Sequence, residues 1–436
     1  MSQPPTVRRH RLRGLRGLLI DLEPVRRDRD FRLLWYGQLV SGVGRQVTVV
    51  ALPFELWQLT HSSLSIGLLA VVQLVPILIF ALGGGAIADA VDRRRLLIVT
   101  QLLLAGTSLS LALLAAQPAP PVWAFYVIAF VTAGVGAVDQ PARASAVPRL
   151  VPRNRLTAAI ALNSLSYEAV SVVGPVFAGV LIQVAGVPTA FTFDVATFLA
   201  SLTALVMIAP IPPHPNATRP GLGAIMEGLR FARARQILLA TFVIDLDAMV
   251  FGMPSSLFPQ LALTVFNTGA AGYGLLTSAP AIGALVGAAL TGWVGRVRRA
   301  GLGVVAAVAG WGGAIVAFGL VTWSFPLALV CLAAAGGADV ISAVLRSSIV
   351  QLETPDQLRG RLMSIHALVV TGGPRVGDAE AAAVAALAGP QFAVVSGGIL
   401  CLAGILVVVR LFPQLLGYEQ RHEELPVTSA SVDSAG

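Results

Sequence analysis

Twelve apolar segments, each long enough to cross a lipid bilayer, follow one another along this chain. A membrane-spanning helix needs about 20 mostly apolar residues, and a bilayer admits only helices and closed barrels. Charged residues make up 12% of the sequence, whereas soluble domains have about 25%. We therefore expect an all-α membrane protein with twelve transmembrane helices. The segments are 31–58, 64–88, 96–116, 121–142, 156–183, 187–209, 237–262, 272–294, 300–322, 325–350, 361–388 and 391–412.

Arginines occur in alternate loops between these segments, and the chain contains no lysine. They lie before the first segment, in the 210–236 connection, and after the second, fourth, eighth and tenth segments. Positively charged loops stay on the cytoplasmic side, which predicts that both termini are cytoplasmic. The net charge of +8 then reflects membrane topology, so we expect a lipid bilayer and a small-molecule substrate as partners, and no nucleic acid. We expect a monomer in a bacterial cytoplasmic membrane, because the missing lysine and abundant alanine and glycine favour a GC-rich genome.

The longest polar interruption divides the series into two six-helix halves. It begins with a proline-rich run and ends in a basic amphipathic segment, which is typical of a helix lying on a membrane surface. Arg143 and Arg346 open the same Arg-x-Ser-x-Val pattern in the two halves, which indicates a parallel repeat. The predicted domains are a cytoplasmic tail at 1–30, helix bundles at 31–209 and 237–412, a linker with the amphipathic helix at 210–236, and a largely disordered cytoplasmic tail at 413–436.

Charged residues interrupt the eleventh segment, where 371–388 carries Arg375, Asp378 and Glu380 beside three glycines and a proline. A charge at the bilayer centre costs about 2.5–3.5 kcal/mol on insertion scales, so such residues usually face an interior or a water-filled cavity. Broken backbone at membrane depth is tolerated where it lines a cavity. We therefore expect a broken, charged helix on a transport pathway, with Arg375 and Asp378 close enough to pair where the stretch is helical.

Other charged residues lie at membrane depth in both halves. Proton coupling needs acids that change protonation there, and burial and a nearby guanidinium shift a carboxyl pKa in opposite directions. A structural role stays open for each acid: we expect Asp194 to be a helix-packing residue, and Glu55 and Asp139 to reach the interface from helix ends, as Asp247 also could. Arg45 could hold an anionic substrate or form a buried structural pair. The candidates for proton coupling or substrate binding are Asp378, Arg375, Glu380, Glu168, Asp339, Asp245 and Arg45.

A loop motif closes the second segment. It runs from Gly85 through Asp89 to Arg93, Arg94 and Arg95, and it resembles the loop signature of the major facilitator superfamily, with two positions that depart clearly. An acid at a helix end that faces guanidinium groups can latch two helices in one state and release them in another. We therefore expect these five residues to act in gating.

A second motif lies in the fifth segment, as Gly174-Pro175-Val-Phe-Ala178-Gly179. It resembles the antiporter motif of exporters in the same superfamily, with alanine in place of one glycine. Small residues allow close helix packing, and proline kinks a helix. Ordinary small-residue packing would also explain the pattern. If the resemblance holds, Gly174, Pro175 and Gly179 favour export over uptake.

Further stretches within 30–412 resemble the drug:proton antiporter branch of this superfamily, including its siderophore exporters. Examples are the loops PARASAVPRLVPRNRL and TPDQLRGRL and the Gly377-Asp378-Ala379 run. The resemblance implies a transporter and no enzyme, working by proton-driven antiport with alternating access and without cofactor or metal. In agreement, the sequence has no ATP-binding phosphate loop. A siderophore of the enterobactin type is the first expected substrate. Hydrophobic drugs, including macrolides, are the alternative, and a non-transporting receptor or scaffold is an alternative of another class.

Overall fold

The computed structural model describes residues 21–212, 222–292 and 297–419. Within these ranges, the side chains of residues 81–90, 222–225, 228, 356, 357 and 364 are not described.

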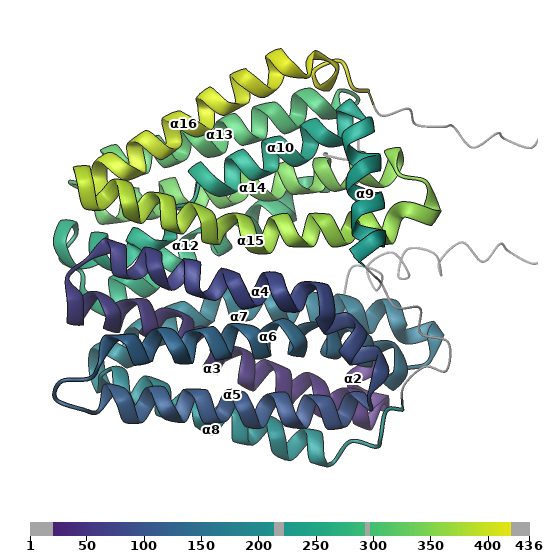
Figure 1. The fold of residues 1–436 in the computed structure, drawn as a ribbon, viewed down its shortest axis with the longest axis vertical. Coiled ribbons are helices and arrows are strands. Elements are labelled where there is room, and N and C mark those ends of the chain that lie inside the picture. The colour runs from purple at the N-terminus through teal and green to yellow at the C-terminus, as the bar shows by residue number, and fades with distance from the viewer. Residues whose placement is uncertain (1–20, 213–221, 293–296, 420–436) are drawn as a thin grey trace, which may run out of the picture.

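The described chain folds into two groups of long, roughly parallel helices, which lie above one another in Figure 1. The first group contains α2 (Glu23–Arg27), α3 (Arg29–Thr60), α4 (Ser63–Ala90), α5 (Arg93–Ala115), α6 (Val122–Leu150), α7 (Leu156–Ala185) and α8 (Val187–Val206). The linker helix is α9 (Leu222–Ala234). The second group contains α10 (Gln236–Phe251), α11 (Phe258–Gln260), α12 (Gly269–Leu290), α13 (Ala300–Leu320), α14 (Phe325–Glu353), α15 (Asp356–Ala388) and α16 (Pro390–Leu411).

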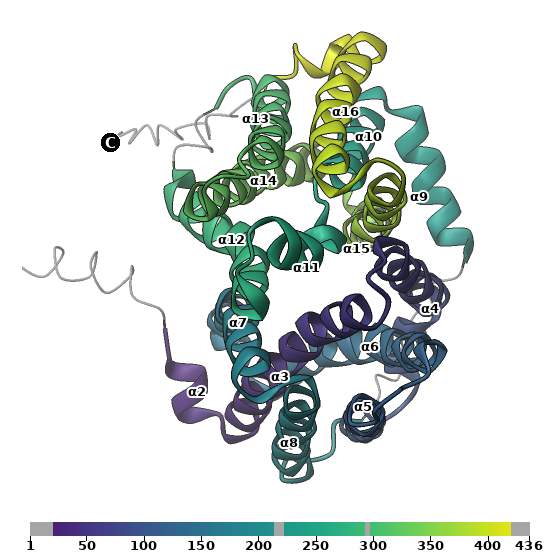
Figure 2. The same cartoon turned by 90° about the vertical axis from the view of Figure 1, so that its left-hand side faces the viewer.

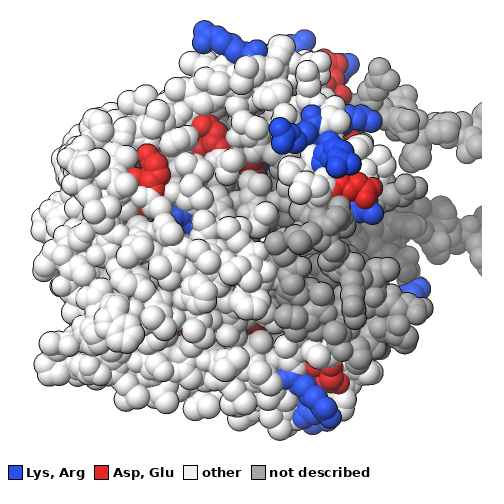
Figure 3. Space-filling model, viewed as in Figure 1, with Lys and Arg blue, Asp and Glu red and all other residues white. Residues whose placement is uncertain are grey.

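Eleven helical segments in the described ranges are long and apolar enough to cross a membrane. The remaining long helix, α15, has 33 residues but carries Arg375, Asp378 and Glu380 within them, which lowers its hydropathy. Figure 3 shows a largely uncharged surface, with most of the visible arginines toward the end that carries α9 and a few charged side chains elsewhere on this face. The prediction of an all-helical membrane fold is therefore confirmed.

The two halves repeat a backbone feature at corresponding positions. Gly186 joins α7 to α8 with φ 81°, and Gly389 joins α15 to α16 with φ 88°. Positive φ values of this kind are accessible to glycine and strained for other residues. The two glycines are separated by the same interval as Arg143 and Arg346, so the repeat seen in the sequence is also a repeat of backbone conformation.

The broken membrane helix is in a different place from the predicted one. The helix α15 runs without interruption from Asp356 to Ala388, with Pro374 inside it. Its glycines serve packing instead: a Cβ atom on Gly377 would lie 2.6 Å from the carbonyl oxygen of Val250 on α10. Glycine in a membrane helix allows two backbones to approach closely, so the prediction of a broken eleventh helix is wrong.

The break lies in the predicted span 237–262. There α10 ends at Phe251, and short turns follow as η2 (Ser255–Leu257), α11 and the π-helix η3 (Leu261–Val265). Pro254 lacks a backbone N–H and disfavours helical backbone at the residue before it. The chain therefore leaves the helix here and brings the Ser255–Ser256 backbone to the interior.

The ordered structure extends beyond the predicted bundles. At the N-terminal side, Arg155 donates to both carboxylate oxygens of Asp28, at 2.8 and 2.9 Å. At the C-terminal side, Leu415 is fully buried, and the Tyr418 hydroxyl donates to Glu353 at 3.0 Å. Burial and this hydrogen bond raise the pKa of Tyr418 to about 12. The segment at 413–419, predicted as part of a disordered tail, therefore packs on the second half.

The linker helix α9 packs on the second half, across the ends of α10 and α15. Ala232 is buried there in a cluster with Leu238 and Leu362. Glu227 pairs with Arg361 on α15, and Arg235 lies 3.6 Å from Glu353. The predicted amphipathic segment is thus a helix, although residues 213–221 of the predicted linker lie outside the described ranges.

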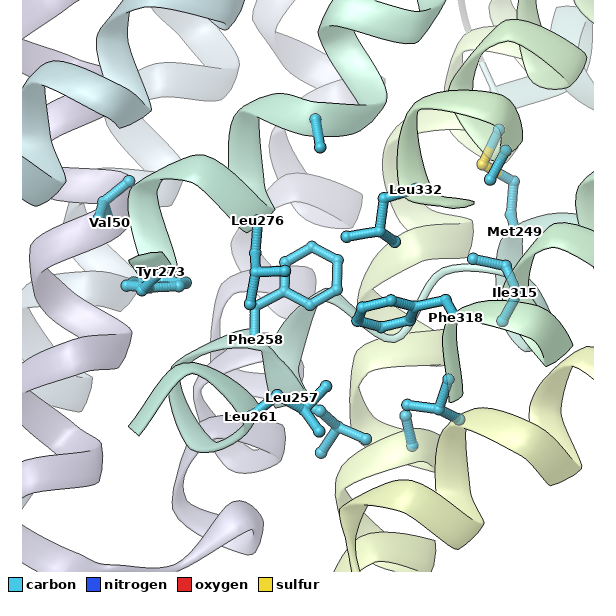
Figure 4. Close-up of a cluster of buried hydrophobic side chains, with 14 of the residues drawn as sticks. Val50, Met249, Leu257, Phe258, Leu261, Tyr273, Leu276, Ile315, Phe318 and Leu332 are labelled. Carbon is cyan, nitrogen blue, oxygen red and sulfur yellow. The ribbon is translucent and has the colours of Figure 1, made fainter. Parts of the chain in front are cut away.

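The two halves meet along two helix pairs, α4 with α15 and α7 with α12, which Figure 2 shows end on. The contact is tight at what we call the arginine-free end, where the loops after α3, α5, α7, α13 and α15 lie. There the Ser63 hydroxyl donates to the side-chain oxygen of Gln260 at 2.7 Å. Figure 4 shows Phe258 packed beside Leu276 and Phe318. Side chains of both halves therefore close this end.

Candidate functional site

Val49 of α3 lines three cavities that lie between described helices. The first has a volume of about 570 Å³ and lies between α3, α6 and α7, with mostly polar side chains. The second, of about 310 Å³, is bordered by α3, α7 and the second half, and it is mostly apolar. The third, of about 120 Å³, lies among the helices of the first half. Together they form a region of the size expected of a small-molecule site.

A buried charge cluster lies in the second half, beside the apolar cavity. Arg346 of α14 is 1% exposed, and its guanidinium lies 2.9 Å from Asp245 of α10 and 3.6 Å from Asp339. The ring nitrogen Nδ1 of His366 lies 3.7 Å from the other oxygen of Asp245. Asp339 also lines the apolar cavity. The structure thus brings two predicted candidates, Asp245 and Asp339, to one arginine.

A second cluster lies in the first half, beside the polar cavity. Arg143 of α6 donates to Asp139 at 2.6 Å, and the Thr100 hydroxyl donates to the same carboxylate at 2.6 Å. Arg143 and Arg45 line the cavity, and Glu168 lies exposed on its wall. Asp139 is completely buried, so the prediction that it reaches the membrane interface from a helix end is wrong. The helix α6 continues past Asp139 to Leu150, and Arg143 pairs with the acid one turn further on.

Three other acidic side chains pack against neighbouring helices. Asp194 is 1% exposed and accepts hydrogen bonds from Thr48 and Ser108, which fits the predicted packing role. Glu55 is 8% exposed, so its predicted reach to the interface is wrong as well. Asp247 lies against α16, where a Cβ atom on Gly404 would overlap its carboxylate.

The residues of the charged stretch in α15 separate in the structure. Asp378 accepts hydrogen bonds from the Ser255 hydroxyl at 2.6 Å and the Ser256 backbone N–H at 2.7 Å. Arg375 lines the cavity of about 120 Å³. Its charge acts electrostatically on Asp378, but no direct ion pair joins the two within the described part of the chain. The expected proximity of these two residues therefore holds, without a direct pair. Glu380 is half-buried and lines none of the three cavities.

Asp378 holds the break in the seventh membrane helix against α15. We expect Asp378→Ala to lower the free energy of unfolding by about 1–3 kcal/mol, because the buried Ser256 N–H would lose its acceptor. Asp378→Asn keeps one acceptor oxygen and should lose less. Thermal unfolding of the purified protein measures both, with Glu380→Ala as the control on the same helix. Equal losses for the alanine and asparagine variants would contradict the hydrogen-bonding role, while the coupling role of Asp378 stays a prediction.

The loop motif is described in part. Gly85 and Asp89 belong to the last turns of α4, whose side chains lie outside the described residues. Arg93 donates to Ser145 at 3.0 Å, and Arg94 donates to the Leu205 carbonyl at 3.2 Å, near the end of α8. Arg95 is exposed, and its backbone N–H is capped by Asp92. The arginines of this loop therefore hold α5 to α6 and α8.

The Gly174–Gly179 motif lies at two helix contacts of α7. A Cβ atom on Gly174 would come 2.5 Å from the Gln46 side chain of α3. One on Gly179 would come 2.5 Å from the Ala270 carbonyl of α12, in the other half. Pro175 lines the apolar cavity. The small residues therefore permit the close contact of the two halves at the arginine-free end.

The sequence analysis missed Arg143, Arg346 and His366 as site residues. The first two were noticed only as markers of the repeat. Arg346 offered a signal, because it lies inside the predicted span 325–350 and an arginine within a membrane bundle usually pairs with an acid. Arg143 lies just beyond the predicted span 121–142. His366 offered none, because its contact with Asp245 depends on how α15 packs on α10. No group of three metal-ligating side chains is found in the described part of the chain.

Comparisons with known proteins give consistent results. A family model described as transmembrane secretion effector matches residues 21–425. Enterobactin exporter EntS of Citrobacter koseri is 27% identical over 416 residues, covering 94% of this chain and 97% of that protein. EntS of Shigella boydii is 26% identical over 422 residues, with 95% and 99% covered.

Solved structures share the fold. A mutant of the peptide transporter POT has a TM-score of 0.71 at 11% identity, covering 89% of this chain and 95% of that chain. A bacterial homologue of the iron transporter ferroportin, in an inward-facing state, has a TM-score of 0.65 at 15% identity, with 89% and 99% covered.

Proposed function

We propose that this chain, which belongs to the transmembrane secretion effector family of the major facilitator superfamily, exports its substrate in exchange for protons. It is a multi-pass secondary transporter and no enzyme. The observation that carries the proton coupling is the cluster of Asp245, Asp339, Arg346 and His366. Two carboxylates share one guanidinium there, beside a cavity that an incoming proton can reach.

In this mechanism the carboxylates compete for Arg346. Protonation of one acid leaves the guanidinium to the other, and the helices that carry them, α10 and α14, can then shift relative to each other. Asp339 lines the apolar cavity and is one-third exposed, whereas Asp245 is buried. The proton therefore enters through Asp339, and Asp245 senses the change from within the bundle.

Alternating access is supported by the asymmetry between the two ends. The contacts of α4 with α15 and of α7 with α12 close the arginine-free end. The polar cavity lies toward the opposite end, between α3, α6 and α7. Since arginine-rich loops stay cytoplasmic, we assign this conformation as inward-facing, with both termini in the cytoplasm of a bacterial cell. The proposed unit is a monomer in the cytoplasmic membrane, driven by the proton gradient without a cofactor.

The proposed substrate is a siderophore of the enterobactin type. Curated relatives that cover 94–95% of the chain are named enterobactin exporters, and the cavities of about 570 and 310 Å³ lie within the range of small-molecule sites.

Mass spectrometry of a strain lacking the gene tests the substrate. Under iron limitation we expect the siderophore to accumulate inside the cells and to fall in the medium, with both levels restored by the cloned gene. Unchanged siderophore in both compartments would reject this substrate.

Hydrophobic drugs, including macrolides, are the second candidate. The apolar cavity supports it, since its wall includes Met253, Phe258, Trp311, Ile315 and Leu332. A susceptibility panel on the same deletion strain distinguishes the two, because only drug efflux predicts lower inhibitory concentrations.

A further inference from the structure

We propose that Arg45 and Arg375 form an anion-binding site, which takes the acidic group of an exported molecule whose remaining body is apolar or aromatic. This inference rests on the proposed export function and specifies its substrate class. The two arginines come from different halves, on α3 and α15, and both line the cavity of about 120 Å³. An anion bound there would contact both halves at once.

The guanidinium groups of both arginines are attracted by acidic side chains without a direct bond to them. Arg45 lies within electrostatic range of Asp139 and Asp194, and Arg375 within that of Asp378. Within the described residues, however, no ion pair or hydrogen bond joins a side chain to Arg45 or Arg375. The Nε atom of Arg45 is buried without a hydrogen-bond acceptor. Unmet N–H donors at a cavity wall are costly, so they indicate a ligand that supplies acceptor oxygens.

The nearby carboxylates are occupied by other contacts. Asp194, which also lines this cavity, accepts from Thr48 at 2.6 Å and Ser108 at 2.7 Å. Asp139 accepts from Arg143 at 2.6 Å. The oxygens of these carboxylates are thus engaged by other donors, and a planar anion can accept the paired N–H groups that the two arginines offer to this cavity.

The volumes of the three cavities indicate a ligand with a small acidic group and a larger body. The cavity at the two arginines, of about 120 Å³, is smaller than the roughly 300–1,000 Å³ of a site for a whole small-molecule ligand, so it suits the acidic group alone. The adjoining cavities of about 570 and 310 Å³ are reached past Val49, and the second of them is mostly apolar. The ligand class is therefore an amphiphilic anion.

The test compares two probes that differ only in charge. These are 2,3-dihydroxybenzoate, an anion at neutral pH, and the neutral 2,3-dihydroxybenzamide, titrated by calorimetry into the purified full chain in lipid nanodiscs. We expect the acid to bind roughly tenfold or more tightly than the amide, since hydrogen bonds between charged groups are the stronger ones. Arg45→Gln and Arg375→Gln should each remove this preference without changing amide affinity.

The controls separate charge from general damage. Arg410→Gln alters an exposed arginine at the end of α16 and should keep the preference. Arg45→Lys and Arg375→Lys keep the charge and should retain part of it. Equal binding of both probes, binding of neither, or an unchanged preference in both glutamine variants would overturn the anion site.

The deletion strain keeps this test distinct from that of the export function. Siderophore export without acid preference in the purified protein would leave the exporter in place and remove the anion site. Acid preference without any change of siderophore in the cells would retain the site and exclude that substrate.

Discussion

Arg346→Gln is expected to abolish proton-driven export and to lower the stability of the folded protein by about 3–5 kcal/mol. Removing one partner of a buried ion pair leaves the other charge uncompensated, and here Asp245 and Asp339 both depend on Arg346. Substrate export driven by an imposed pH gradient in proteoliposomes measures the first effect, and thermal unfolding measures the second. Arg153→Gln, at an exposed arginine of the 3-10 turn 153–155, is the matched control and should behave as the parent.

A double variant separates folding from coupling. Asp245→Asn together with Arg346→Gln removes both members of the closest pair, so it should recover part of the lost stability. Export should remain absent, because the cluster can no longer exchange a proton for the guanidinium. Proton-driven export by Arg346→Gln at the parental rate would show that coupling lies elsewhere, with Asp378 as the first acid to examine.

Gly179→Val is expected to shift the protein out of the conformation described here and to stop transport. A Cβ atom at residue 179 would lie 2.5 Å from the Ala270 carbonyl in the opposite half. Overpacking of this kind costs about 1–3 kcal/mol. A free-energy change of that size shifts the ratio of two conformations by a factor between about five and more than a hundred. The halves can relieve the overlap by separating at the arginine-free end.

A disulfide cross-link measures this shift. Ser63 and Gln260 make a hydrogen bond between the halves, so Ser63→Cys with Gln260→Cys should cross-link readily after the native Cys331 and Cys401 are changed to serine. Adding Gly179→Val should reduce the cross-linked fraction severalfold. Gly106→Val is the control, since nothing lies within 4 Å of a Cβ atom there. Undiminished cross-linking in the Gly179 variant would refute the steric explanation.

The membrane fold followed from the sequence because each span carries its own signal of about 20 apolar residues. The prediction of where a helix breaks was wrong because glycine and proline have two effects in membrane helices. They weaken a helix, and they also let membrane helices pack closely. In α15, Gly377 allows close packing on α10 and the helix is continuous. Near Pro254, by contrast, the helix α10 ends.

The candidate site was harder to predict than the fold. Asp245 and Asp339 were recognised as membrane-depth acids, but their common partner was missed. Asp339 shares α14 with Arg346, two turns away, whereas Asp245 lies on α10, distant in sequence. Depth was misjudged for Asp139 and Glu55, because α6 and α3 extend beyond the predicted spans. Sequence patterns place a charge along one helix, and only the packing of helices against each other decides which charges meet.

The position of Val49 has a consequence for how the substrate range of this transporter can evolve. Its side chain is 47% exposed and borders all three cavities. A single substitution here, Val49→Ala or Val49→Phe, would widen or narrow all three cavities at once. A lineage under selection by a new toxic compound could therefore alter its cargo at one codon, while the helix contacts and the charge cluster that run the transport cycle stay untouched.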